Sequence, residues 1–149
     1  MEIFKKLEEL KVDKTFQNLF SILCSYGDRT AAEYREEDGI KKLSYADYER
    51  ITMAGALKLS GLLEGIGKNT FVALKFSNHP LWPAAFWSII LAGYRPLLVD
   101  STLDDGQVMH ILKQAGSRTI VSETQVGIGG IKQVSPFDFL SVDSKPAVF

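Results

Sequence analysis

Few side chains in this 149-residue sequence have the types and spacing that catalysis or metal binding requires. The two histidines, His79 and His110, lie far apart, and His110 has no His, Cys or carboxylate four residues further on to share a metal ion from one helix face. The single Cys24 lies in an amphipathic run, residues 16–26, where a small core residue is a better interpretation than a nucleophile. We therefore expect neither a metal site nor a catalytic residue in this sequence.

Four side chains are candidates for contacting a ligand: Asn78, His79, Ser101 and Thr102. They follow two segments that we expect to be neighbouring parallel strands, and ligands bind beyond the carboxyl ends of strands in open α/β sheets. For the turn that carries His79, starting the next helix is the favoured alternative role. Ser101 or Thr102 can cap the helix that follows them, and a helix N-terminus can hold an anion. No Lys or Arg lies between residues 118 and 132 to add a phosphate contact in the next loop.

Two further patterns suggest ligand binding but have simpler explanations. The glycines of residues 127–130 resemble a phosphate loop, but a P-loop also needs a terminal Lys-Ser/Thr pair and a following helix, so a flexible loop is favoured. The aromatic group of Trp82, Phe86 and Trp87 could line a cofactor slot. On an apolar helix, however, core packing is the favoured role for such a group.

The elements that position the candidate residues centre on residues 71–100. Residues 71–76 alternate and are rich in β-formers, which predicts a strand, and residues 94–99 form a second, almost continuously apolar strand. Between them, residues 81–92 predict a buried helix, ended by Gly93 and too short for the ~20 residues of a membrane span. A strand, a helix and a strand with short connections predict a parallel βαβ unit.

The flanking segments extend this pattern. Thr15 can cap a second N-terminal helix after one over residues 2–11, and Asp38-Gly39 predicts a hairpin. The Ser44–Asp47 capping box predicts a helix to about residue 64, in which Gly55 and Gly61 suggest close packing against another backbone. Further on, the pattern predicts a helix over about 104–115, a strand over 118–122 and one more possible strand over 131–134.

Together these elements predict an α/β fold, a three-layer αβα sandwich with a parallel central sheet. We expect a single domain or subdomain over residues 1–149. Its parts are N-terminal helices (1–26), a hairpin (31–43), an αβαβαβ unit (44–122) and an irregular tail (123–149).

The charge, the cysteine count and the N-terminal residues bear on binding partners and cellular location. The formal net charge of −1 gives no electrostatic basis for nucleic-acid binding. A lone cysteine is typical of the reducing cytoplasm, and the amphipathic start MEIFKKLEEL lacks the apolar run of a signal peptide. We therefore expect a cytoplasmic protein that binds neither nucleic acid nor membrane.

Four segments in matching order resemble the adenylate-forming superfamily of acyl-CoA synthetases, luciferases and peptide-synthetase adenylation domains. L-S-Y-A-D-Y at residues 43–48 is similar to its L-[TS]-Y-x-E-L motif, and residues 91–100 are similar to its L-K-A-G-x-x-x-x-P-[IL]-[DN] motif. Residues 72–74 and 78–82 resemble its V-A-[IL] strand and N-[ST]-P-E-W turn. The resemblance covers about residues 15–122.

The sequence departs from the family pattern at three places: residues 68–70, Val99 and Tyr48. A Gly-Asp pair is usual before the strand, Pro is usual at the position of Val99, and Leu is usual at that of Tyr48. These are structural positions, so the departures concern the subgroup rather than the fold.

The resemblance implies the N-terminal part of an enzyme's large domain. Such enzymes use ATP and Mg to activate a carboxylic acid as an acyl-adenylate, then pass the acyl group to the thiol of CoA or a carrier protein. The phosphate loop, the ribose-binding segment and the mobile lysine-bearing domain follow this region in the family, and residues 147–149 resemble the strand before the phosphate loop. We expect this chain to be inactive alone and to need no cofactor of its own. The alternative is a non-catalytic α/β binding or interaction module.

Overall fold

The computed structural model describes residue 5 and residues 15–143, so the helix expected over 2–11 falls almost wholly outside the described residues and the apolar run 147–149 falls entirely outside them. The contacts divide the chain into two compact units, residues 1–49 and residues 50–149.

The first unit contains a short helix and a hairpin. Helix α2 spans Phe16–Cys24, and the Thr15 hydroxyl caps it by accepting the Asn18 N–H at 3.1 Å, as predicted. Strands β1 (Thr30–Glu36) and β2 (Gly39–Ser44) pair antiparallel around the Asp38-Gly39 turn, which confirms the expected hairpin. Gly39 has a φ of 131°, a conformation that favours glycine.

Helix α3 (Tyr45–Leu62) begins at the predicted capping box. The Ser44 hydroxyl accepts the Asp47 N–H at 3.0 Å, and the Asp47 carboxylate accepts the Ser44 N–H at 2.8 Å. Two backbone donors that the helix itself cannot satisfy are thereby paired, which is what the box contributes to helix initiation.

The second unit is built on a four-stranded parallel sheet in the order β4-β3-β5-β6. Its strands are β3 (Phe71–Lys75), β4 (Arg95–Val99), β5 (Thr119–Ser122) and β6 (Lys132–Val134). The parallel pairing of β3 with β4 confirms the central βαβ unit. Strand β6 confirms the additional strand expected over 131–134, so part of the segment expected to be irregular is ordered into the sheet.

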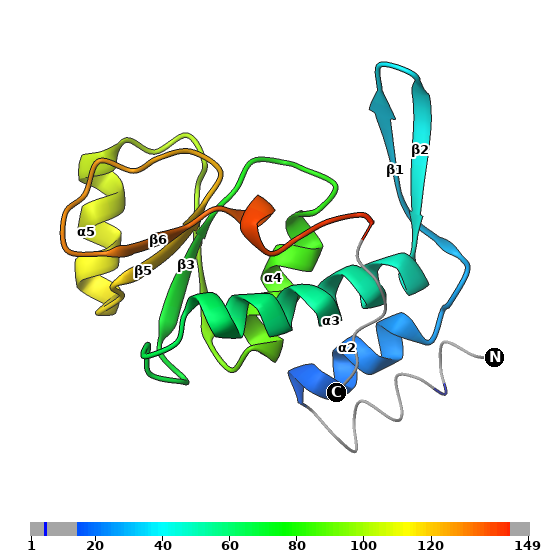
Figure 1. The fold of residues 1–149 in the computed structure, drawn as a ribbon, viewed down its shortest axis with the longest axis horizontal. Coiled ribbons are helices and arrows are strands. Elements are labelled where there is room, and N and C mark those ends of the chain that lie inside the picture. Colours follow the sequence, from blue (N-terminus) through cyan, green and yellow to red (C-terminus); the bar gives the residue numbers. More distant parts are fainter. Residues whose placement is uncertain (1–4, 6–14, 144–149) are drawn as a thin grey trace. The chain divides into compact units, whose positions relative to one another are not determined.

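Helices lie on both faces of this sheet, which confirms the three-layer arrangement. Helix α5 (Asp105–Ala115) covers one face, whereas α4 (Trp82–Leu91) and residues 50–62 of α3 lie on the other (Figure 1). On that second side, the Ser88 hydroxyl of α4 donates to the backbone oxygen of Thr52 in α3 at 3.2 Å.

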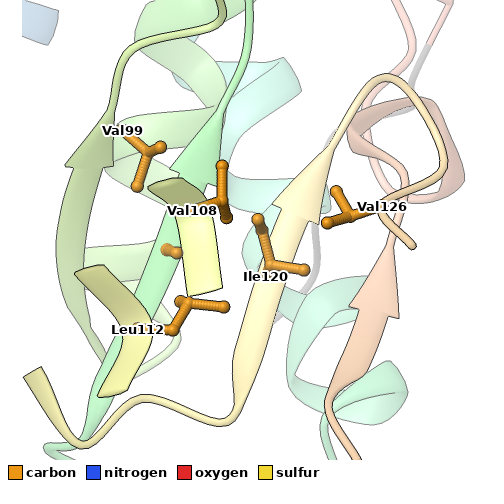
Figure 2. Close-up of a cluster of buried hydrophobic side chains, with 6 residues drawn as sticks. Val99, Val108, Leu112, Ile120 and Val126 are labelled. Carbon is orange, nitrogen blue, oxygen red and sulfur yellow. The ribbon is translucent and has the colours of Figure 1, made fainter. Parts of the chain in front are cut away.

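A cluster of small and branched apolar side chains joins α5 to the sheet (Figure 2). Val108 and Leu112 of α5 are buried together with Ile120 of β5. Full burial of such a side chain stabilises a fold by about 1.5–3 kcal/mol, so this cluster fixes α5 firmly on the sheet. The buried members are Ala73, Val99, Val108, Leu112, Ile120 and Val126.

The two glycines inside α3 differ in their surroundings. A Cβ added at Gly55 would lie 2.8 Å from the Ser88 Oγ atom and 2.9 Å from the Leu140 Cδ2 atom, which confirms the close packing predicted there. A Cβ added at Gly61 would meet nothing within 4 Å, so the same prediction is wrong for Gly61.

Candidate functional site at the carboxyl edge of the sheet

The order of the strands singles out the space between β3 and β5. From β3 the chain passes through α4 to β4 on one side, and it then returns through α5 to β5 on the other side of β3. The connections therefore diverge between β3 and β5, and ligands of open α/β sheets bind at such a switch point, beyond the carboxyl ends of the strands. The turn with Asn78 and His79 follows β3, and Glu123 follows β5.

Glu123 ties these two strand ends together. Its carboxylate accepts the Ser77 N–H at 2.7 Å and the Ser77 hydroxyl at 3.0 Å, through a different oxygen in each case. Hydrogen bonds to an ionised carboxylate are stronger than bonds between neutral groups. The turn after β3 is therefore anchored at its first residue, although 46 positions separate the two partners in the sequence.

His79 is held in one orientation by this turn and by two aromatic rings. Its Nδ1 atom accepts the Leu81 N–H at 3.0 Å, which assigns the proton of the neutral ring to Nε2. The ring stacks on Phe76 with centroids 5.0 Å apart and meets the edge of Phe137 at 5.4 Å. The imidazole can thus donate a hydrogen bond from Nε2 in a direction that the fold determines.

Burial lowers the pKa of His79, and the nearby negative charge of Glu123 opposes that change in part. The neutral ring is consequently the favoured form at pH 7. The other candidate on this turn, Asn78, is exposed.

The loop after β4 is organised by Asp100. The Asp100 Oδ1 atom accepts both the N–H and the hydroxyl of Thr102 at 2.8 Å. These two bonds, the backbone one first, lower the pKa of the Asp100 carboxyl, and the ammonium of Lys75 acts in the same direction. Ser101 lies half-buried in this loop, and Thr102 is exposed.

The expectation that Ser101 or Thr102 caps the next helix is wrong. Asp104 caps α5, because its carboxylate accepts the Gln107 N–H at 2.8 Å while the Gln107 side chain accepts the Asp104 N–H at 3.1 Å. The Thr102 hydroxyl is already bound to Asp100. Since Asp105 adds a second carboxylate to the first turn, the N-terminus of α5 is a poor anion site.

Lys75 is a functional candidate that the sequence analysis missed. It is the last residue of β3, only 9% exposed, and its ammonium donates to the backbone oxygen of Ser101 at 3.0 Å. The sequence shows that the loop after β5 lacks a cation, but only the strand register places Lys75 beside Val99, at the start of the loop with Ser101 and Thr102. A lysine that ends an otherwise apolar central strand was the signal available in the sequence.

His110 and Cys24, the two residues that the sequence already disfavoured for metal binding and catalysis, each lie in surroundings without reactive partners among the described residues. His110 is exposed on α5, and the part of the chain that the structure describes holds no group of three or more His, Cys, Asp or Glu side chains able to bind a metal ion. Burial, with a smaller effect of Glu49, raises the pKa of Cys24 to about 12, so this thiol is a poor nucleophile at neutral pH.

The glycine-rich segment after β5 connects to β6 rather than to a helix. Its Gly127 N–H donates to the Asp105 carboxylate at 2.9 Å, so an acidic group faces this backbone. A P-loop requires a helix behind the loop and a lysine, and this segment therefore does not form one.

The three aromatic residues of α4 stack on one another. Trp82 and Phe86 lie parallel with centroids 5.6 Å apart, and Phe86 meets Trp87 edge-on at 5.3 Å. All three rings are half-buried, so the group packs on the protein with part of its surface exposed, and neither core packing alone nor a cofactor slot describes it. No helix within the described residues is long and apolar enough to cross a membrane.

Comparison with known proteins gives one family match. A family model described as AMP-binding enzyme matches residues 23–145. The search of curated proteins found no match.

Solved structures match the fold over most of the chain. The N-terminal subdomain of NpsA from Klebsiella oxytoca, in complex with 3-hydroxybenzoyl-AMSN, superposes with a TM-score of 0.75 at 18% identity over 89% of this chain and 33% of that one. An artificially fused adenylation-PCP di-domain, NpsA-ThdA from Klebsiella oxytoca, gives 0.73 at 20% identity over 83% of this chain and 23% of that one.

A four-domain nonribosomal peptide synthetase bound to AMP and glycine gives a TM-score of 0.69 at 17% identity, over 89% of this chain and 9% of that one. At these identities the matches establish the fold. The chain spans about a third of the length of the NpsA subdomain.

Proposed function

Because this chain belongs to the family of AMP-binding enzymes, we propose that it is the N-terminal part of an ATP-dependent acid-thiol ligase. The observation that carries the proposal is the family match over residues 23–145, together with the fold shared with adenylation domains. In the ligase, the carboxylate attacks the α-phosphate of ATP to form an acyl-adenylate and release pyrophosphate. The thiol of CoA or of a carrier protein then attacks the acyl carbon, which forms the thioester and releases AMP. We place it in the cytoplasm on the ground of its single cysteine.

The family implies ATP and Mg for the complete enzyme, but the described residues do not fit either group. The only glycine-rich segment with a phosphate-loop resemblance faces the Asp105 carboxylate, and the described part of the chain has no cluster of metal-ligating side chains. We therefore derive no step of ATP chemistry from these residues, and we propose that the chain is inactive on its own.

The role proposed for this part is to form one wall of the ligand site of the complete enzyme. Asn78, His79, Ser101 and Thr102 contribute to this wall from two neighbouring loops at the carboxyl edge. Of these, His79 offers the best-defined group, because its neutral ring is fixed with Nε2 as the donor.

A carrier-protein thiol is the favoured acceptor. Residues 119–131 contain no Lys or Arg, and the start of α5 carries Asp104 and Asp105. These features disfavour the phosphates of free CoA, although Lys75 lies nearby with its ammonium bound to Ser101. A solved structure of similar fold is an artificially fused adenylation-PCP di-domain, which agrees with this choice.

The test reads the gene beyond the codon of Phe149 and compares the 149-residue chain with any longer polypeptide that the gene encodes. A reading frame that continues after Phe149 into T-S-G-[ST]-T-G-x-P-K-G within about ten residues supports the ligase, because such glycine-rich loops cradle phosphates. Pyrophosphate exchange over a panel of carboxylic acids should then be present in the longer protein and absent from the chain alone. Micromolar binding of ATP-Mg to the isolated chain by calorimetry would contradict the proposal, and a frame without the loop would favour the non-catalytic module.

The acceptor is tested separately in the longer protein. Acyl transfer to CoA and to a holo-carrier protein is measured before and after Ser101→Glu, whose added charge should repel a nucleotide phosphate. We expect efficient transfer to the carrier protein in both forms. Efficient transfer to free CoA that Ser101→Glu leaves unchanged would remove this loop from the site.

A further inference from the structure

We propose that Glu123 is a positioning residue for His79, whose carboxylate holds the turn after β3 and thereby sets the direction of the imidazole Nε2–H. The inference rests on the proposed function in one respect, the assignment of His79 to the ligand-contacting wall. The contacts that carry it belong to this chain alone, so it can be tested without the rest of the enzyme.

The first step is the anchoring of the turn. Ser77 donates its N–H to one oxygen of Glu123 at 2.7 Å and its hydroxyl to the other at 3.0 Å. Two bonds to a planar carboxylate fix both the position and the rotation of Ser77, which a single bond would not. The turn is thus held against the carboxyl end of β5, at the switch point of the sheet.

The second step links the turn to the imidazole. His79 lies two residues after Ser77, and its Nδ1 atom accepts the N–H of Leu81, the residue that precedes α4. Release of Ser77 from Glu123 would let His79 move relative to Leu81, and the loss of this bond is the consequence that the proposal predicts. Nδ1 could then carry the proton, and the ring would lose its single tautomer.

The third step is the packing of the ring. Phe76 stacks on His79, and the edge of Phe137 meets it from the segment after β6. Phe137 and Phe76 also contact each other, with ring centroids 5.7 Å apart. These rings limit the tilt of the imidazole only while the turn holds His79 against both of them, so the packing depends on the same anchor.

Glu123 acts electrostatically on His79, and the first turn of α4 carries no acidic residue. On the third element, the short helix Pro136–Asp138, the Asp138 carboxylate accepts the Ser135 N–H at 3.0 Å. Substitutions of Glu123 can therefore test its hydrogen bonds to Ser77 separately from the effect of its negative charge on His79.

The experiment is a pH titration of the His79 side chain by nitrogen-detected NMR, using the 149-residue chain. In the unsubstituted protein we expect the Nε2–H tautomer. In Glu123→Gln the amide still reaches Ser77 while the charge is lost, so the tautomer should persist and the pKa of His79 should fall further. In Glu123→Ala the anchor is lost, so both tautomers should appear and the pKa should rise toward its ordinary value as the ring becomes hydrated.

Ser77→Ala removes one of the two bonds and leaves the carboxylate in place. It should change the tautomer and the pKa of His79 in the same direction as Glu123→Ala, but to a smaller extent. It replaces Glu123→Ala as the test variant if that protein does not fold. The matched control is Thr124→Ala, an exposed neighbour whose change should leave the His79 signals unchanged.

The proposal is overturned if Glu123→Ala and Glu123→Gln both lower the pKa of His79 while the single tautomer remains, because Glu123 would then act as a charge only. It is also overturned if neither variant changes the His79 signals. Failure of the ligase assignment would instead appear as missing pyrophosphate exchange in the longer protein, with the His79 tautomer unaffected.

Discussion

Gly55 of α3 lies so close to Ser88 of α4 that no side chain fits between the two helices. A Cβ atom at position 55 would lie 2.8 Å from the Ser88 Oγ atom, whose hydroxyl is bound to the backbone of Thr52. The same atom would lie 2.9 Å from the Leu140 Cδ2 atom and 3.3 Å from the backbone oxygen of Phe139. This glycine therefore joins α3, α4 and the segment after β6 in one packed contact.

Substitution of the two glycines of α3 by alanine should have opposite effects. Gly55→Ala should lower the free energy of unfolding by about 1–3 kcal/mol, as overpacking of a core does. Gly61→Ala should raise it by up to about 1 kcal/mol, because a Cβ atom there meets nothing and alanine favours the helix. Urea unfolding followed by circular dichroism measures both, and equal destabilisation by the two changes would contradict this account of the helix contact.

Thr102→Val should raise the pKa of Asp100 without restoring its ordinary value. The change removes the hydroxyl bond to Asp100 and keeps the backbone bond, which is the larger cause of the lowered pKa. A carboxyl with a pKa lower in the folded state stabilises the fold above its unfolded pKa, and that contribution disappears as the pH falls through the folded pKa. The titration of Asp100 by carbon-detected NMR checks the shift, with Thr124→Val as the control.

Cys24 should react slowly with iodoacetamide in the folded protein. With a pKa of about 12, the thiolate is a very small fraction at pH 8, and its fraction rises about tenfold for each pH unit up to the pKa. Mass spectrometry over a pH series measures the rate. Glu49→Gln should accelerate the reaction only modestly, because burial is the main cause of the raised pKa; a rate in the folded protein equal to that in urea would contradict the prediction.

Local patterns in the sequence predicted the helices and strands, whereas the arrangement of the candidate site depends on contacts between residues far apart in the sequence. Alternation and apolar runs placed β3, α4 and β4 correctly, because such patterns arise from the burial of each strand or helix and can be read from its own residues. The pairing of Ser77 with Glu123 depends on strand order, which periodicity does not encode. For this reason Glu123 was not among the candidates, although Asn78 and His79 were.

The start of α5 shows a second limit. Ser101, Thr102 and Asp104 are all residues that cap helices, so composition alone left several positions possible for the cap. In the structure, the Thr102 hydroxyl is bound to Asp100 and does not cap the helix. Asp104 and Gln107 form the capping box instead. Competition among neighbouring polar side chains of this kind is resolved only by the geometry of the loop.

Lys75→Met should leave the stability of the protein nearly unchanged while it raises the pKa of Asp100. The methionine side chain replaces most of the buried stem, and the loss of the bond to Ser101 is offset because an ammonium no longer has to be buried; the net change should be within about 1 kcal/mol. Lys75→Ala should destabilise by about 2 kcal/mol or more, since it also leaves a cavity. Lys132→Met, at an exposed position of β6, is the matched control.

Two measurements, the amide signals of the loop and the pKa of Asp100, test whether Lys75 organises this edge of the sheet. If its ammonium holds the loop of residues 100–102, the amide signals of Ser101 and Thr102 should shift in both variants and remain in place in the control. The pKa of Asp100 should rise in both, because the ammonium contributes to lowering it. A pKa of Asp100 that stays the same in Lys75→Met, with the loop signals unmoved, would show that the bond between Lys75 and Ser101 does not organise this edge of the sheet.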